Sequence, residues 1–302
     1  MRVFLTGASG YIGSSVARAL TRAGHDAVGL VRKPEQAKRL EAHEGTAVLG
    51  EMGDPGTWRE AAGTCGALIH CAADGSASQW DLDGRTVDAL LAIARDAGRP
   101  RRVLYTSGVW VYGTTGNTPA DESSPLAPPA LNAPRPGIEQ RVLAGNAGAV
   151  RTLVLRPGCV YGGPGSLTAT WFEAGAKGAR ARVIGKGTER WAMVHRDDLA
   201  DAYVRALESP YGGEVFNVVD RSRFTVLDCA RAAMGAAGGT GEPELVPLEK
   251  ARAELGPFAD ALALDQHVDA RKAASLLGWQ PRHGGFVDGV DRYHRAWRAH
   301  RA

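Results

Sequence analysis

Three glycines near the N-terminus have the spacing of a dinucleotide-binding loop. Gly7, Gly10 and Gly13 follow directly after the short apolar run at residues 2–6, and the segment behind them keeps helical periodicity to residue 23. In a strand–loop–helix unit this spacing gives a tight turn, lets the backbone approach a pyrophosphate and lets the helix pack closely on the strand. An ordinary glycine turn is the alternative, and the flanking strand and helix argue against it. The sequence therefore predicts a dinucleotide site.

Two cations stand where the second strand of such a unit ends. Arg32 and Lys33 follow the strand expected at residues 27–31. A carboxylate at this point would hydrogen-bond a free ribose 2′-hydroxyl and repel a 2′-phosphate. Two cations and no acid favour NADP(H) as the cofactor. The alternative is a pair of solvated surface cations.

The elements that would position these residues alternate along the chain. Apolar runs predict strands, and helical patterns separate them. We expect strands at residues 2–6, 27–31, 46–49, 67–71, 103–107, 151–155 and 215–219, and helices at 12–23, from 34, at 85–97 and at 198–208. This order predicts an α/β fold with a doubly wound parallel sheet of the Rossmann type.

The chain divides into two expected parts. Residues 1–161 would form the NADP-binding Rossmann domain, completed by about 190–220, and residues 162–302 would form mostly a smaller C-terminal lobe that binds substrate. Residues 118–136 hold six prolines in nineteen positions. Because so many prolines exclude a regular helix, we expect an extended loop or lid there.

Composition excludes several other classes of protein. Among 302 residues, 36 Lys and Arg are balanced by 33 Asp and Glu. Without a localised basic stripe we expect no nucleic-acid partner, and no stretch approaches the ~18 apolar residues of a membrane span. The four cysteines lie far apart with no Cys-x-x-Cys pair. We therefore expect no metal site and a reducing, cytoplasmic location.

Further motifs follow the glycine loop in a fixed order. They are Ile69-His70-Cys71-Ala72-Ala73, Tyr105-Thr106-Ser107-Gly108-Val109-Trp110-Val111-Tyr112-Gly113, Arg156-Pro157-Gly158-x-Val160-Tyr161-Gly162, Val194-His195-x-Asp197-Asp198-Leu199-Ala200 and Leu277-Gly278-Trp279-x-Pro281. Together they resemble the extended short-chain dehydrogenases/reductases of the epimerase/dehydratase type over nearly the whole chain. This resemblance implies an enzyme that binds a nicotinamide cofactor.

The resemblance also implies which residues meet the cofactor. Glu51 and Met52 would lie at the adenine, and the loops at Ala72-Ala73 and residues 157–160 would lie on the nicotinamide side. The full set is Gly7, Ser9, Gly10, Tyr11, Ile12, Arg32, Lys33, Glu51, Met52, Ala72, Ala73, Thr106, Pro157 and Val160.

The usual catalytic residues of that family have no counterpart in our alignment. Such enzymes carry a Tyr and a Lys four apart on one helix, where the cation lowers the pKa of the phenol, and a Ser or Thr before it. Aligned on Arg135 and Glu139, the Tyr and Lys positions fall on Ala133 and Gly137, and the Ser or Thr position falls on Gly108. None of these three can exchange a proton.

Other residues are candidates for the missing chemistry. Ser107 could hydrogen-bond a carbonyl, or it satisfies a backbone group. Tyr161 could exchange a proton, although tyrosines in this motif usually pack. For substrate contact we single out Ser107 again, Trp110, which could stack on a flat ring or pack in the core, and Arg135, which could meet an anion or be a loop cation.

Loss of the triad leaves three functions open. The pattern resembles ketoreductases of aromatic polyketide antibiotic pathways, the simocyclinone type, that lack the triad. It therefore favours an NADPH-dependent ketoreductase for an aromatic, angucyclinone-like ketone that supplies its own proton. The alternatives are a non-catalytic NADP(H)-binding redox sensor and a sugar-nucleotide epimerase or dehydratase relative. The sequence leaves the oligomeric state open.

Overall fold

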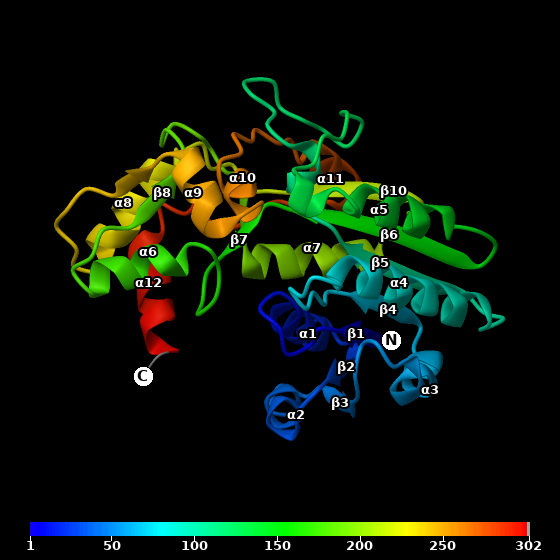
Figure 1. Cartoon of the computed structure of the whole chain (residues 1–302). Helices are drawn as coiled ribbons and strands as arrows, with labels where there is room; N and C mark the ends of the chain where they lie inside the picture. The colour runs from blue at the N-terminus through cyan, green and yellow to red at the C-terminus, as the bar shows by residue number, and fades with distance from the viewer. Residues whose placement is uncertain (301–302) are drawn as a thin grey trace.

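The computed structural model describes residues 1–300 and is built around a parallel sheet of seven strands (Figure 1). The strand order is β10-β6-β5-β4-β1-β2-β3. The strands are β1 (Arg2–Thr6), β2 (Asp26–Val31), β3 (Thr46–Leu49), β4 (Ala67–His70), β5 (Arg101–Thr106), β6 (Val150–Pro157) and β10 (Glu214–Val218). The chain first winds outward from β1 to β3 and then returns to the other side through β4. This confirms the doubly wound α/β fold and puts its switch point between β1 and β4.

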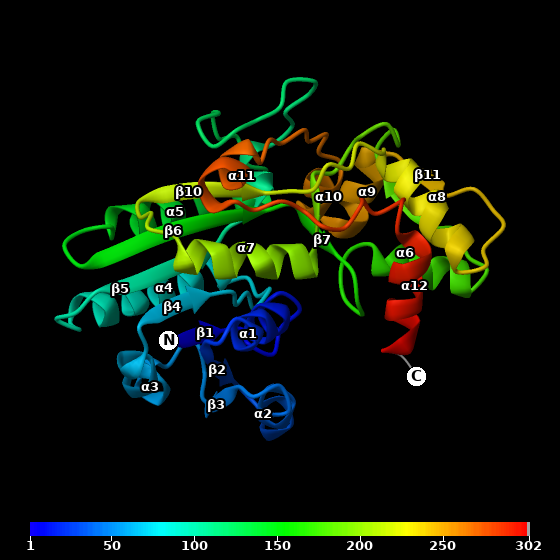
Figure 2. The same cartoon turned by 180° about the vertical axis from the view of Figure 1, so that it is seen from behind.

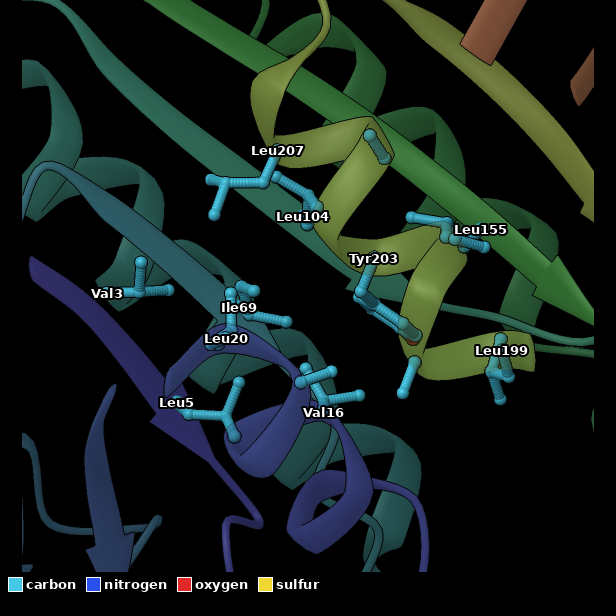
Figure 3. Close-up of a cluster of buried hydrophobic side chains, with 14 of the residues drawn as sticks. Val3, Leu5, Val16, Leu20, Ile69, Leu104, Leu155, Leu199, Tyr203 and Leu207 are labelled. Atoms are coloured by element: carbon cyan, nitrogen blue, oxygen red, sulfur yellow. The ribbon is translucent and has the colours of Figure 1, made fainter. Parts of the chain in front are cut away.

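Helices cover both faces of this sheet. Apolar side chains of α1 and α7 pack on one face, where Val16 and Leu20 meet Leu199 and Tyr203 (Figure 3). The opposite face is covered by α3, α4 and α5. The helices that flank the sheet are α1 (Gly13–Arg22), α2 (Pro34–Glu41), α3 (Arg59–Thr64), α4 (Gln79–Arg95), α5 (Arg135–Ala144), α7 (Arg196–Glu208) and α11 (Arg271–Leu277). Within the described residues, none of the helices is both long and apolar enough to cross a bilayer.

A smaller lobe is assembled from two separate segments, before α7 and after β10. Figure 2 shows α6, α8 and α12 together at one end of the molecule. Its elements are β7 (Cys159–Tyr161), α6 (Ala169–Ala176), β8 (Arg182–Ile184), β9 (Met193–His195), α8 (Val226–Ala236), β11 (Glu244–Val246), α9 (Leu248–Leu255), α10 (Phe258–Leu262) and α12 (Val290–Ala299). Buried aromatic rings fill its core, among them Tyr161, Trp171 and Phe286.

Most element bounds lie within two residues of the expected ones, and two differ by more. Helix α4 begins at Gln79, whereas we expected residue 85. The expectation missed this start because Trp80 and Leu82, the apolar side chains within residues 79–84, are two positions apart, which is not helical spacing. The proline-rich segment ends earlier than expected, since a short 3₁₀ turn, η3 (Ala130–Asn132), leads into α5 at Arg135. Prolines at the first turn of a helix cost no hydrogen bond, because those N–H groups have no partner within the helix.

The rest of the proline-rich segment is tied to the C-terminal part of the chain. It lies above α5 and α11 in Figure 1. Ala120 N donates to His267 O at 2.8 Å, and Asp269 N donates to Ala120 O at 2.8 Å. The Glu122 carboxylate accepts from Asn217 N at 2.7 Å on β10. These contacts anchor the segment at the sheet edge, so only its last residues reach the site described next.

Candidate functional site

The glycine loop leaves no room for side chains. Gly7 has φ +71°, and a Cβ there would lie 2.8 Å from the backbone of Ala72, after β4. A Cβ on Gly13 would lie 2.1 Å from Gly7 O. Helix α1 has no side-chain N-cap and no acidic residue in its first turn. The N–H groups of Tyr11, Ile12 and Gly13 have no hydrogen-bond partner among the described residues, so they can receive a pyrophosphate, and the loop fits a dinucleotide.

The side chains expected at the adenosine end are exposed. Arg32 and Lys33 follow β2, and Glu51 lies two residues after β3. Neither cation forms an ion pair with a described residue, so both remain available to an anionic ligand. Ser9 is also exposed, within the glycine loop.

Two adjoining cavities, called the cleft below, lie at the carboxyl ends of the central strands. The larger, of about 410 Å³, is lined mainly by apolar groups. The smaller, of about 140 Å³, shares Ile12, Ser107 and Arg135 with it. Predicted residues that line the larger cavity are Tyr11, Ile12, Ser107, Gly108, Trp110, Arg135, Pro157 and Val160; those of the smaller one include Met52, Ala72, Ala73 and Thr106.

Ser107 is held by a buried ionic network under the cleft. Its hydroxyl donates to the carboxylate of Glu139, which also accepts from Arg156 Nε at 3.0 Å and Nη2 at 2.5 Å. Arg156 Nη1 donates to the Tyr112 hydroxyl at 2.7 Å. Burial raises the pKa of Tyr112 to about 12. The Ser107 proton is thus directed at Glu139, and Tyr112 is a packing residue of the network.

Tyr161 lies away from the cleft. It is fully buried in the smaller lobe, where its hydroxyl donates to Asp220 Oδ2 at 2.9 Å. Burial raises the pKa of this phenol far above its ordinary value. The structure therefore does not bring Tyr161 together with Ser107.

Trp110 does line the cleft. The indole is half-buried, and its ring lies edge-on to Phe258 of α10 with centroids 6.1 Å apart. The Trp110 indole thus connects the carboxyl end of the sheet with the smaller lobe, and it also forms part of the cavity wall.

The start of α5 corrects our alignment. Ala133 and Gly137 are exposed, and neither lines the cleft. The buried face of this helix carries Ile138 and Glu139, and one turn earlier that face presents Arg135. The side chains of this segment that line the cleft are Asn132 and Arg135. The error was one of register, since the prolines and glycine of this segment give no apolar periodicity. No tyrosine occurs between Tyr112 and Tyr161, so no register supplies one here.

One cluster of possible metal ligands occurs among the described residues, at His195, Asp197 and His283. The imidazole rings of His195 and His283 stack at 3.6 Å with an interplanar angle of 22°. Because imidazole lone pairs lie in the ring plane, two nearly parallel rings cannot aim both nitrogens at one ion. We therefore assign no metal to it.

Sequence reasoning missed several residues of the cleft. Asn132, Cys159, Ser166 and Leu167 line the larger cavity, and Trp80 lines the smaller. Cys159 is the unspecified position within the motif at residues 156–162, whereas Asn132 and Trp80 belong to no motif. Burial raises the pKa of Cys159 to about 12, so this thiol is no nucleophile.

Comparison with known proteins gives several relatives. An uncharacterised protein of Schizosaccharomyces pombe is 30% identical over 95% of this chain and 97% of its own. A 4-hydroxy-2-methyl-3-oxo-4-farnesyl-3,4-dihydroquinoline-1-oxide ketoreductase of Stigmatella aurantiaca is 28% identical, covering 84% and 78%. A UDP-glucose 4-epimerase of Mycolicibacterium smegmatis is also 28% identical, covering 93% and 94%.

Solved structures share the fold. The dTDP-glucose 4,6-dehydratase of Bacillus anthracis, solved in complex with NAD, superposes with a TM-score of 0.85 at 19% identity, covering 99% of this chain and 97% of that one. The sequence profile of the NAD dependent epimerase/dehydratase family matches residues 3–219. That span includes the glycine loop, the cleft and all seven strands of the sheet. The chain belongs to the NAD dependent epimerase/dehydratase family.

Proposed function

We propose that the protein is an NADPH-dependent ketoreductase acting on an aromatic, polyketide-like ketone in antibiotic biosynthesis. The observation that carries this proposal is the larger cavity of the cleft, which is apolar and presents Trp110 beside the dinucleotide loop. A flat aromatic ring system fits such a lining. The relative from Stigmatella aurantiaca, named for reduction of a dihydroquinoline ketone, supports the same class of substrate.

Arg32 and Lys33 support NADPH over NADH. Both are exposed at the end of β2 and form no ion pair within residues 1–300, at the place where the 2′-phosphate of the cofactor would lie. When bound, NADPH supplies the hydride for reduction of the ketone. The protein must then position the ketone, exclude water and hold the negative charge that develops on oxygen.

The proton is proposed to come from the substrate itself. Ser107 directs its hydroxyl proton to Glu139, Gly108 has no side chain, and Tyr161 lies outside the cleft. A phenol beside the ketone would polarise the carbonyl through its internal hydrogen bond and donate to the forming alkoxide. Such substrate assistance removes the need for the family's tyrosine.

A sugar-nucleotide substrate is the main alternative, in view of the epimerase and dehydratase relatives. A diphosphate needs paired cations or a helix N-terminus to neutralise its charge. In the larger cavity Arg135 is the one charged side chain among the lining residues. This favours a ketone with at most one anionic group. A redox sensor would bind NADPH without turnover.

The test is NADPH oxidation with three substrates: an aromatic ketone with an adjacent phenol, its O-methyl ether, and a sugar nucleotide. We expect turnover of the phenolic ketone alone, with the ether still binding. Good reduction of the ether would contradict substrate assistance. Turnover of the sugar nucleotide alone would contradict the ketoreductase proposal, and NADPH binding without any turnover would favour the sensor.

A further inference from the structure

We infer that Arg135 and Asn132 together bind two neighbouring oxygen atoms of the substrate, and that Arg135 stabilises the phenolate left when the phenol gives its proton to the reduced carbonyl. The inference rests on the proposed function, because it concerns the ketone in the same cleft. It adds the chemistry by which this chain would recognise that ketone. It also names a residue, Asn132, that no sequence motif marks.

Arg135 reaches the centre of the cleft. It lines both cavities, and its guanidinium carbon lies 4.8 Å from the centroid of the Trp80 ring. A Cβ on Gly108 would lie 3.7 Å from Arg135 Nη1. The guanidinium is therefore stacked on one side and faces the position where the family's Ser or Thr would stand.

Apart from its stacking on Trp80, this guanidinium has no hydrogen-bond or ion-pair partner among the described residues. Its Nε is shielded from solvent without a hydrogen bond, and Arg135 forms no ion pair. Leaving a partly desolvated cation unpaired is costly, and the usual remedy is an anion. The observation points to a ligand that the structure does not contain.

The carboxylates nearest the cleft are already engaged by other donors. Asp83 accepts from the Tyr105 hydroxyl at 2.6 Å and lies 2.8 Å from His70 Nε2. Glu139 is held by Arg156 and Ser107, as described above. Asp74 accepts from the backbone and hydroxyl of Ser76. None of these acids forms an ion pair with Arg135.

Asn132 supplies a second, independent observation. Only 6% of this residue is exposed, yet its Oδ1 is buried without a hydrogen-bond partner, and the residue lines the larger cavity. Asn132 N donates to Pro129 O at 2.8 Å. Trp80 Nε1 donates to Leu131 O at 3.0 Å, which ties this turn to α4. A buried amide held in place without a partner is expected to meet a polar ligand.

The pair selects one kind of ligand. A guanidinium offers parallel N–H groups that match two oxygens side by side, and an amide can donate to one oxygen or accept from a hydroxyl. A ketone with an adjacent phenol presents two such oxygens to the guanidinium, and the alcohol formed by its reduction presents an O–H that Asn132 Oδ1 can accept. The cation would favour the phenolate, so the pKa of the bound phenol falls. Arg135 stays a cation throughout, because a guanidinium is not deprotonated in proteins.

The test is a spectroscopic titration with a chromophoric ortho-hydroxyaryl ketone. The protein is loaded with NADP⁺, which cannot reduce the ketone, so binding is measured apart from turnover. In the wild type we expect the bound phenol to ionise about 1–2 pH units below the free phenol. Arg135→Met should abolish this shift and weaken binding by about 10- to 100-fold, and Arg135→Lys should restore part of both.

Two further variants control the experiment. Asn132→Leu should weaken binding while Arg135 still lowers the phenol pKa. Arg141→Met lies on the same helix but removes an exposed cation paired with Asp88, and should change neither quantity. Thermal unfolding and NADP⁺ affinity, measured for each variant, separate a local effect from a misfolded protein.

Each outcome decides the inference. If Arg135→Met leaves the phenol pKa and affinity unchanged, or weakens NADP⁺ binding instead, the pair does not serve the substrate. If the wild type binds the ketone with a lowered phenol pKa but never oxidises NADPH, this site stands and the ketoreductase proposal fails. If the wild type reduces the ketone and Arg135→Met changes neither the phenol pKa nor the affinity, the ketoreductase proposal stands and the inferred site fails. No binding by the wild type overturns both.

Discussion

Two buried groups on either side of Tyr161 are expected to give opposite pH dependences of stability. The Tyr161 ring lies 5.4 Å from that of His195, and its hydroxyl donates to Asp220. Burial, and then the neighbouring His283, lowers the pKa of His195 from 6.5 to about 4. Burial raises the pKa of Asp220 from 3.8 to about 6. The other charged groups that act on this pair are Arg196, Asp197, Asp198 and Asp288.

The signs follow from proton counting. Between pH 4 and 6.5 the unfolded chain protonates His195 and the folded chain does not, so stability rises with pH by about 3 kcal/mol across this window. Between pH 3.8 and 6 the folded chain keeps a proton on Asp220 that the unfolded chain has lost. Stability from this group therefore falls by about 3 kcal/mol as pH rises. The two contributions offset each other in the wild type.

Single variants should expose each contribution. His195→Asn keeps a side-chain acceptor for Asp197 N at the start of α7, and Asp220→Asn keeps an acceptor for Tyr161. Urea unfolding at pH steps from 4 to 7 should give a nearly flat profile for the wild type. The free energy of unfolding should fall with pH in His195→Asn and rise with pH in Asp220→Asn. Parallel profiles for all three proteins would refute this reasoning.

Three other changes test the cofactor loop and the buried network. Arg32→Ala should weaken NADPH binding by about 10- to 100-fold and leave NADH binding unaffected. Fluorescence titration measures both affinities. Equal affinities of the wild type for NADPH and NADH would contradict the NADP(H) proposal. Glu139→Ala should cost about 3–5 kcal/mol of stability because it leaves Arg156 buried and unpaired. Asp88→Ala, which breaks the exposed pair between Asp88 of α4 and Arg141 of α5, should cost under ~1 kcal/mol. Similar losses in urea unfolding would show that burial of the pair does not matter. Gly13→Ala should abolish NADPH binding, since its Cβ would overlap Gly7 O, while Gly63→Ala, whose Cβ meets nothing within 4 Å, should leave binding intact.

The centre of the sheet was predictable because its strands β1 and β4 are buried on both faces. Runs such as residues 2–6 and 67–70 are nearly continuous apolar segments, which have few other interpretations. The first turn of α4 was missed for the opposite reason. Its apolar residues, the half-buried Trp80 and Leu82, are two positions apart among polar residues, and this spacing does not indicate a helix.

The dinucleotide half of the site was predictable from the sequence, and the substrate half was not. The dinucleotide loop is a local backbone structure, and the glycine spacing along seven residues contains most of its geometry. The substrate half joins residues that are far apart in sequence, such as Tyr11, Asn132 and Leu167. Only the packing of the lobe against the sheet brings them together, and no short pattern encodes that packing.

The helix at α5 shows why a motif alignment alone is a weak guide to catalysis. Moving the alignment by two residues replaces Gly137, which is exposed, by Arg135, a cation in the centre of the cleft. The buried contacts of Glu139 with Arg156 decide the register, because only one face of the helix can reach that pair. The same contacts turn the Ser107 proton away from the cleft. The buried network of Glu139 and Arg156 therefore has two effects on the cleft. It sets the helix register that puts Arg135 in the cleft, and it binds the Ser107 hydroxyl so that its proton does not point at the substrate.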